Sequence, residues 1–216
     1  MTHRENKPDR KRLIGRHYEH RIDTARPSFE ILDWASAQSQ RARFEILANN
    51  VDLAGKSLLD VGCGLGDLLG YMQERSIAVQ YTGVDILEKM VEAARARHKD
   101  GRFLVADLFR GDSPFAPGSF DVVFCSGAFN LNLGNNRQFL PAAFNTLLAL
   151  ARQTLAVNLL HSRSRTQEQT YFYYDPADIR RMHLCDDCHM RIIDDYLHND
   201  FTVLCDKTIS GGGKSR

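Results

Sequence analysis

Three glycines at alternate positions open the most informative stretch of this 216-residue sequence, because their spacing suits a ligand-binding turn. Gly62, Gly64 and Gly66 follow the apolar run 57–61, and a helical pattern comes after them. A strand, a glycine turn and a helix form the opening of a nucleotide-binding βαβ unit. Glycine suits such a turn because it adopts backbone angles that a β-carbon forbids and lets a ligand approach the main chain. We therefore expect this loop to contact a nucleotide-like ligand.

Two carboxylates flank the loop and bear on the charge of that ligand. Asp60 lies near the end of the apolar run, and Asp67 stands where the dinucleotide-binding fingerprint has its third glycine. A pyrophosphate binds a helix N-terminus through its negative charge, so a carboxylate at that place would repel it. The loop therefore favours a ligand that carries positive charge, and it disfavours a nicotinamide-dependent oxidoreductase.

Two further acidic residues each follow an expected strand. Asp85 ends the run 79–85, 23 positions beyond Gly62, where a carboxylate can accept hydrogen bonds from both hydroxyls of a ribose. The alternative is that Asp85 caps the next helix. Asp107 follows the run 102–106 and could accept a hydrogen bond from the exocyclic amine of a base.

A fourth segment, 120–125, leads into Ser126 and Gly127, which are small enough to leave room for a ligand at the edge of a sheet. Together the four segments resemble the class I S-adenosylmethionine-dependent methyltransferases, in order and spacing, over residues 56–160. The resemblance implies S-adenosyl-L-methionine as cofactor and S-adenosyl-L-homocysteine as product. It assigns the glycine loop and its acidic neighbours to the amino-acid end of the cofactor, and the later acidic residues to the ribose and the adenine amine. The cofactor-binding residues that it implies are Asp60, Gly62, Gly64, Gly66, Asp85, Ile86, Asp107, Leu108 and Cys125.

The nature of the methyl acceptor is constrained mainly by motifs that the sequence lacks. The segment after residue 125 does not carry the Asn-Pro-Pro-aromatic pattern of many enzymes that methylate amino groups of nucleic acids and proteins. We therefore expect a small-molecule acceptor, methylated at nitrogen, oxygen or sulfur. The alternatives are an RNA or protein methyltransferase that uses the basic segment 4–21, and a non-catalytic regulatory module that binds the cofactor.

Candidate catalytic and acceptor-binding residues come from the segments that follow the later strands, because the carboxyl ends of parallel strands meet at one edge of a sheet. A tyrosine-rich segment, 161–175, could cover that edge and clamp an aromatic or cationic acceptor. For each candidate the alternative is an ordinary surface or core residue. The catalytic candidates are His161, His198 and Ser126, and the candidates for acceptor binding are Tyr18, Asn130, Tyr171, Tyr173 and Tyr196.

The alternation of strand and helix predicts the fold that must position these residues. It indicates a Rossmann-like, doubly wound α/β sheet of seven strands, mostly parallel with an antiparallel C-terminal hairpin strand, and with helices on both faces. We expect one domain, divided into a flexible basic arm (1–12), an N-terminal helical cap (13–55), the Rossmann-like core (56–207) and a flexible tail (208–216). The expected strands are 57–61, 79–85, 102–106, 120–125, 154–160, 190–196 and 201–205; the expected helices are 28–35, 36–49, 66–75, 88–98, 137–150 and one that begins at 175–176.

Composition and charge limit the other classes of function. The sequence is 43% apolar and 25% charged with a net charge of +1, so no overall field indicates a nucleic-acid or membrane partner. The five cysteines and the polar N-terminus predict a cytoplasmic protein with reduced thiols. The Cys-x-x-Cys-His run 185–189 is interpreted as a turn, since neither a haem nor a zinc site is complete around it, and no metal is expected. The oligomeric state is expected to be a monomer or a homodimer.

Overall fold

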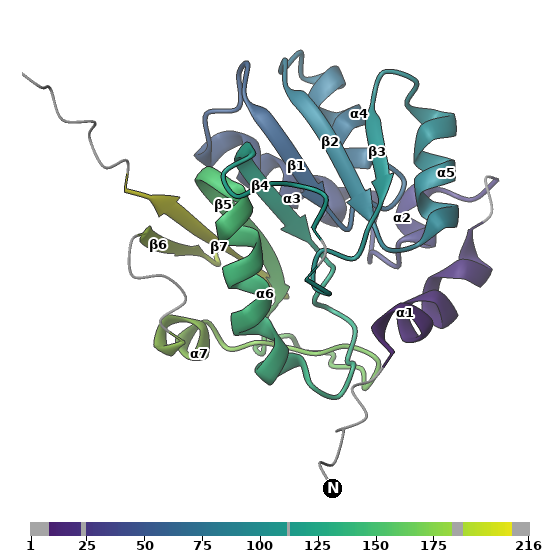
Figure 1. Ribbon diagram of the computed structural model, residues 1–216. Coiled ribbons are helices and arrows are strands. Elements are labelled where there is room, and N and C mark those ends of the chain that lie inside the picture. The colour runs from purple at the N-terminus through teal and green to yellow at the C-terminus, as the bar shows by residue number, and fades with distance from the viewer. Residues whose placement is uncertain (1–8, 23–24, 112, 183–187, 209–216) are drawn as a thin grey trace, which may run out of the picture.

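A seven-stranded sheet organises the computed structural model, which describes residues 9–22, 25–111, 113–182 and 188–208. The strand order is β3-β2-β1-β4-β5-β7-β6, and β7 is antiparallel to both of its neighbours while the other pairs are parallel (Figure 1). This confirms the predicted fold class. The strands are β1 (Ser57–Val61), β2 (Gln80–Asp85), β3 (Arg102–Val105), β4 (Phe120–Ser126), β5 (Ala151–Leu160), β6 (Cys188–Ile193) and β7 (Asp200–Lys207).

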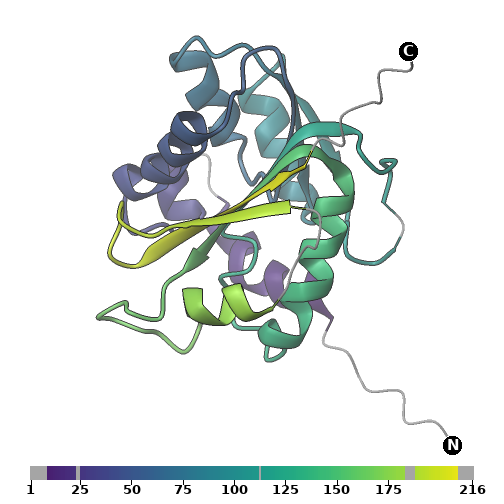
Figure 2. The ribbon, with the colours of Figure 1, turned by 90° about the vertical axis from the view of Figure 1, so that its left-hand side faces the viewer.

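Helices cover both faces of the sheet, as Figure 2 shows in a view in which α3 and α4 lie on one side and α6 on the other. Because successive strand residues point to opposite faces, Leu58 packs in the cluster under α3, α4 and α5, whereas Leu59 packs in the cluster under α6. Both leucines are fully buried. The helices are α1 (Arg10–Tyr18), α2 (Ser28–Ile31), α3 (Ala37–Asn50), α4 (Asp67–Glu74), α5 (Glu88–Arg97), α6 (Asn136–Leu150) and α7 (Pro176–Arg181), with a 3₁₀ turn η1 (Glu19–Arg21) after α1.

The helix starts follow local capping chemistry. Ser36 and Ser39 form a reciprocal capping box at the start of α3. At α7 the Asp175 side chain accepts a hydrogen bond from the Ala177 amide and Pro176 takes the first helical position, as the sequence predicts. These hydrogen bonds set the residue at which α3 begins and the residue at which α7 begins, after the tyrosine-rich segment.

Helix α1 corrects the expectation of a flexible arm over residues 1–12. Residues 10–12 form its first turn, which Asp9 caps by accepting a hydrogen bond from the Arg12 amide at 3.3 Å. The helix is stabilised by packing of Ile14 and Tyr18 on the apolar cluster around Leu87, a tertiary effect that a polar sequence does not announce. Residues 1–8 and 209–216, the remainder of the expected arm and tail, lie outside the described residues.

Three smaller expectations about the later part of the chain are also corrected. Strand β5 begins at Ala151, earlier than the expected 154–160, and β6 ends at Ile193, so that Tyr196 lies in the hairpin connection and not in a strand. Cys188 is disulfide-bonded, which contradicts the expectation of reduced thiols throughout. Residues 183–187, which include most of the Cys-x-x-Cys-His run, lie outside the described residues. Among the described helices, none combines the length and the apolar character that a membrane crossing would need.

Candidate functional site

A cavity of about 840 Å³ lies at the carboxyl ends of the parallel strands, where the strand order reverses between β1 and β4. Open α/β sheets bind ligands at this kind of switch point, and the volume suits a small-molecule site. Its walls come from the glycine loop, the ends of β2, β4 and β5, the helix α1 and residues 164–173. Figure 1 shows α1 and the segment after β5 beyond the arrowheads of the parallel strands.

The three loop glycines divide into two roles. Gly62 and Gly64 line the cavity, and both have positive φ, +74° and +53°. A β-carbon on Gly62 would lie 3.1 Å from the β-carbon of Ala128, so glycine keeps this part of the cavity open. Gly66 does not line the cavity, and a β-carbon there would collide with the rings of His98 and Phe103. Its glycine therefore serves the packing of α4 and not ligand approach.

Asp85 lies in the cavity wall at the end of β2 and retains hydrogen-bonding capacity. Its Oδ2 accepts from the Gly64 amide at 3.0 Å and its Oδ1 from the Leu87 amide at 2.9 Å. Burial raises the pKa of Asp85, and the amide hydrogen bonds oppose that effect. A carboxylate can accept more than two hydrogen bonds, so Asp85 joins the glycine loop to Leu87, the residue before α5, and can still accept from a ligand in the cavity. Ile86 lies beside it in the same wall.

Asp107 and Leu108 line the neighbouring part of the cavity, after β3. The Asp107 Oδ1 accepts from the Phe109 amide at 3.1 Å, and its Oδ2 is 3.3 Å from Arg110 Nε. From α1, the Arg10 guanidinium lies over an aromatic ring on α6 and also lines the cavity. This region therefore joins a hydrogen-bond acceptor to apolar side chains, the combination that the base of a nucleotide needs.

The structure places Asp60 and Asp67 outside the cavity wall, contrary to expectation. Asp60 is 4% exposed and accepts a hydrogen bond from the Tyr81 hydroxyl at 2.7 Å; burial raises the pKa of Asp60 to about 7. Asp67 accepts hydrogen bonds from Ser28 and Gln40, so its carboxylate joins α4 to α2 and α3. The argument that Asp67 selects a cationic ligand is therefore not supported by its position.

At the end of β4, neighbouring residues point in opposite directions. Cys125 is fully buried in the core, where desolvation raises the pKa of its thiol, and it does not line the cavity. Ser126 does line the cavity, and its buried hydroxyl has no hydrogen-bond partner within the described part of the chain. The period of two in a strand explains why one candidate reaches the site and the other does not.

Of the two candidate histidines, one lines the cavity and the other does not. His198 lies in the cavity wall as an exposed side chain in the connection before β7. His161 is 8% exposed and lies outside the wall; its Nδ1 accepts from the Arg163 amide at 3.1 Å, and its ring packs against Phe201. His161 is therefore a core residue at the end of β5, which removes it as a general base in this geometry.

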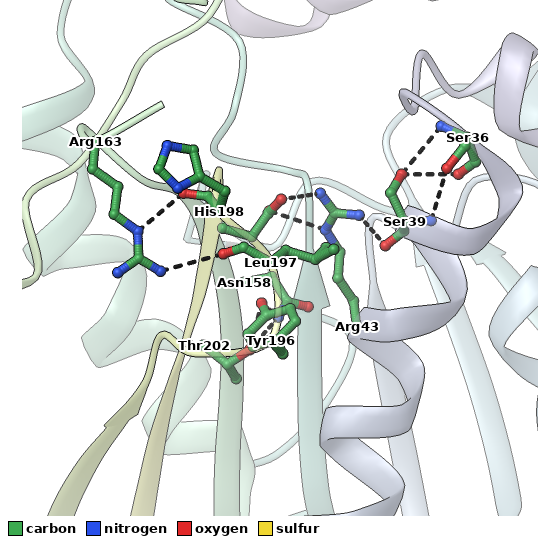
Figure 3. Close-up of polar contacts among 10 residues, drawn as sticks. Ser36, Ser39, Arg43, Asn158, Arg163, Tyr196, Leu197, His198 and Thr202 are labelled. Carbon is green, nitrogen blue, oxygen red and sulfur yellow. Dashed lines mark hydrogen bonds and ion pairs between the residues drawn. The ribbon is translucent and has the colours of Figure 1, made fainter. Parts of the chain in front are cut away.

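Among the acceptor-binding candidates, Tyr18, Asn130, Tyr171 and Tyr173 line the cavity and Tyr196 does not. The Tyr196 hydroxyl lies 3.2 Å from Asn158 Nδ2 and 2.9 Å from Thr202 Oγ1, within the hairpin (Figure 3). Burial raises the pKa of Tyr196 to about 12. Tyr196 therefore stabilises the β5–β7 pairing from a place away from the ligand.

A cluster around Asp33 is a feature of the site that the sequence did not predict. The Asp33 carboxylate lies 2.8 Å from His17 Nε2 and 2.6 Å from Arg21 Nη1, and it accepts a hydrogen bond from the Tyr171 hydroxyl. Burial alone would raise the pKa of Asp33, but these hydrogen bonds and the Arg21 charge outweigh it and lower the pKa. All four side chains line the cavity. The cluster thus joins the N-terminal cap to the tyrosine-rich segment across the cavity.

A buried ion pair holds the other side of the cavity, and Figure 3 shows it between α3 and the start of β7. Arg43, only 2% exposed, donates to both carboxylate oxygens of Asp200, through Nε at 3.0 Å and through Nη2, and also to the Ser39 carbonyl. The Arg43 guanidinium lies 4.2 Å from the centre of the Trp34 ring. Arg43 therefore fixes the indole of Trp34, which also lines the cavity.

Comparison with known families fits this geometry. Residues 58–152 match the family model described as Methyltransferase domain. With the strand order and the cavity at its switch point, the match over these 95 of the 216 residues supports the class I S-adenosylmethionine-dependent methyltransferase superfamily.

Particular relatives differ in their acceptors. The chain is 29% identical over 119 residues to demethylmenaquinone methyltransferase of Thermotoga maritima, a match that covers 55% of this chain and 51% of that protein. It is 35% identical over 117 residues to the mouse 18S rRNA (guanine-N(7))-methyltransferase, covering 51% of this chain and 41% of that protein. The matched segments thus span about half the length of these curated relatives or less.

The fold also resembles a solved structure, magnesium protoporphyrin IX methyltransferase from Synechocystis PCC 6803 with bound S-adenosylhomocysteine. The TM-score is 0.66 at 17% identity, and the similarity covers 93% of this chain and 100% of that one. At this identity the similarity establishes a common fold, which extends over the helical cap as well as the sheet.

Proposed function

We propose that this protein is an enzyme that transfers the methyl group of S-adenosylmethionine to a small-molecule acceptor held in the cavity at the β1–β4 switch point. The observation that carries the proposal is that Gly62, Gly64, Asp85 and Asp107 line the same cavity. These are residues that the resemblance to the superfamily assigns to cofactor binding. The name of the Thermotoga maritima relative supports a small-molecule acceptor.

The residues of the wall fit the cofactor on structural grounds. Gly62 leaves open the space that a β-carbon would occupy, so the amino-acid end of the cofactor can approach the main chain. The Asp85 carboxylate lies in the wall and can accept from ribose hydroxyls beside its bonds to backbone amides. Asp107 and Leu108 can take the amine and the face of the adenine. When bound, S-adenosylmethionine supplies a methyl group on a sulfonium centre.

The chain itself supplies alignment and a base. His17 lines the cavity, and its Nε2 proton is directed to Asp33, which leaves Nδ1 able to accept a proton. Burial lowers the pKa of His17 although the Asp33 carboxylate opposes this, so the net shift favours the neutral imidazole. As the acceptor atom bonds to the methyl carbon, His17 takes the proton that the acceptor loses. This role replaces the one expected for His161.

The enclosure of the cavity favours a small acceptor over RNA. The bond from Tyr171 to Asp33 holds residues 164–173 against the cap, and the isolated β-bridge between Leu131 and Tyr171 holds them against the segment after β4. An acceptor must lie beneath these contacts to reach the end of β4. The mouse relative, by its name, keeps RNA methylation as a second candidate function.

Transfer of a radioactive methyl group distinguishes these possibilities. The protein is incubated with methyl-labelled S-adenosylmethionine and, in separate reactions, with a pool of small hydroxy, amino and thiol compounds, with total RNA, and with a protein extract. Label in the small-molecule pool supports the proposal. Label in RNA or protein alone would overturn the acceptor class, and no label in any reaction would contradict methyl transfer.

A further inference from the structure

Three buried polar atoms without partners gather in one part of the cavity wall. Within the described part of the chain, seven buried side-chain nitrogen or oxygen atoms have no hydrogen-bond partner, and four of them belong to residues that line this cavity. Three are Trp34 Nε1, Ser126 Oγ and Asn130 Oδ1; the fourth is Arg21 Nε. A buried polar group without a partner costs about 1–3 kcal/mol, and native structures leave few of them. Their concentration in one wall therefore indicates groups that a ligand satisfies.

The three side chains surround a single backbone position at the end of β4. A β-carbon built on Gly127 would lie 2.7 Å from the Trp34 ring and 3.8 Å from Asn130 Nδ2, and Gly127 directly follows Ser126. The next residue, Ala128, faces Gly62 of the cofactor loop. The group of Trp34, Ser126 and Asn130, here called the β4 subsite, therefore adjoins the place where the reactive end of the cofactor is proposed to lie.

The β4 subsite contains no charged side chain, and the charges beside it are paired. The Trp34 ring is held by the Arg43 guanidinium. Asp200 neutralises that guanidinium through both of its carboxylate oxygens, and Figure 3 shows the Arg43 side chain with its hydrogen bonds. The neighbouring Arg21 is neutralised by Asp33. A site without a charge to offer selects its ligand by hydrogen-bond pattern and shape.

The hydrogen-bond pattern of the β4 subsite defines the group that it can bind. The Trp34 N–H can only donate, the Asn130 Oδ1 can only accept, and the Ser126 hydroxyl can do either. A carboxylate would leave the Asn130 oxygen without a donor, and an ammonium would leave the Trp34 N–H without an acceptor. A neutral hydroxyl satisfies both at once. Aromatic side chains, among them Tyr18 and Tyr171, also line the cavity and suit a flat ring.

We propose that the β4 subsite binds the hydroxyl group of a phenol or hydroquinone, so that the acceptors of this protein are flat, uncharged hydroxyaromatic molecules. This inference rests on the proposed function and names its substrate class. His17 lies in the same cavity, and its neutral imidazole is suited to taking the proton of a phenol.

The test compares close analogues on protein loaded with S-adenosylhomocysteine. For the wild type we measure binding of four naphthalene derivatives: 2-naphthol, 2-methoxynaphthalene, 2-naphthoate and 2-naphthylmethylamine. The same comparison is made with one-ring compounds, of which hydroquinone is the hydroxyl-bearing member. We expect the naphthol to bind about tenfold or more tightly than its methyl ether, because the ether cannot donate to Asn130. Equal affinities, tighter binding of the acid or the amine, or no binding of any hydroxyaromatic compound would overturn the inference.

Two variants and a control assign the effect to the subsite. Asn130→Leu removes the acceptor at similar volume and should abolish the preference for naphthol over its ether. Trp34→Phe removes the donor while leaving a ring for Arg43, and it should weaken naphthol and its ether alike, because the oxygen of each can accept from the indole N–H. Asn135→Leu is the control, since Asn135 Oδ1 is also buried without a partner among the described residues but lies outside the cavity wall, and it should keep the preference. Binding of S-adenosylhomocysteine is measured first for every protein. The subsite assignment alone fails if S-adenosylhomocysteine binds but the wild type shows no preference for naphthol, or if the preference survives in Asn130→Leu. If S-adenosylhomocysteine does not bind the wild type, the proposed function fails as well.

Discussion

Replacing Asp60 with asparagine tests the electrostatics beneath the glycine loop. Asp60 is 4% exposed, and burial raises its pKa from 3.8 to about 7, partly opposed by the hydrogen bond from Tyr81. A carboxyl group whose pKa is higher in the folded state favours folding when it is protonated. Its contribution to stability is therefore fully present below pH 3.8 and is lost as the pH rises through about 7.

The magnitude follows from the size of the shift. Roughly three pH units at 1.36 kcal/mol each give a penalty of about 4 kcal/mol above pH 7 for burying the ionised group, as an upper limit. Asparagine carries no charge, and its side-chain oxygen can still accept from Tyr81. The stability of Asp60→Asn relative to the wild type should therefore be greater at pH 8 than at pH 5 by about 3 kcal/mol, the part of the penalty that develops over roughly two pH units.

Urea unfolding at pH 5, 6, 7 and 8, followed by circular dichroism, measures this difference. Asp121→Asn is the control, because hydrogen bonds from Ser57 and the Arg152 side chain lower the pKa of Asp121, and its contribution is lost only as the pH falls through that lowered pKa. Its effect should be constant between pH 5 and 8. A pH-independent effect of Asp60→Asn, or one that shrinks toward pH 8, would refute the reasoning.

Three further predictions concern the base, the buried ion pair and the loop. His17→Gln should lower the rate of methyl transfer about 10²- to 10⁴-fold and remove the loss of activity expected for the wild type as the pH falls through the lowered pKa of His17, read from rate profiles against pH. Arg43→Met should destabilise the protein by about 3–5 kcal/mol in urea unfolding, because it leaves the Asp200 carboxylate buried without its partner. Gly62→Ala should cost about 1–2 kcal/mol for its positive φ and also weaken binding of S-adenosylhomocysteine in calorimetry.

Each of these has a matched control in the chain. His20→Gln changes an exposed histidine outside the cavity and should leave the pH profile unchanged. Adding Asp200→Leu to Arg43→Met should restore most of the lost stability; no recovery would contradict the ion-pair argument. Gly55 has the same φ of +74° with no atom within 4 Å of an added β-carbon, so Gly55→Ala should share the stability cost without affecting the ligand. Equal effects of the two glycine variants on binding would count against the role of Gly62.

The sequence predicted the parts of the site that depend on strand ends. Asp85 and Asp107 lie in the cavity wall because Asp85 ends β2 and Asp107 lies two residues beyond β3, and apolar runs with their flanking turns locate such ends well. Gly62 and Gly64 follow from the same argument. Choices between neighbouring residues were harder, as Cys125 and Ser126 show, because the face that a strand residue takes depends on the register of the whole sheet.

Contacts between distant segments could not be predicted from the sequence. The sequence predicts that Asp67 binds a ligand. In the structure its carboxylate instead accepts hydrogen bonds from Ser28 and Gln40, which lie far earlier in the chain. Likewise the approach of Tyr171 to Asp33 joins residues 138 positions apart, and neither lies in a motif. Such pairs form only when the cap helices settle on the sheet, which is tertiary packing and not local propensity.

Calorimetric titration of S-adenosylhomocysteine into the purified protein tests the central claim most directly. We expect one molecule to bind per chain, and Asp85→Ala to weaken binding about tenfold to a hundredfold, because hydrogen bonds to a charged group are worth about 1.5–3 kcal/mol. Asp100→Ala, an exposed carboxylate outside the cavity wall, should bind as the wild type does. The absence of binding to the wild type, or the same affinity in Asp85→Ala, would contradict the assignment of this cavity to the methyl donor.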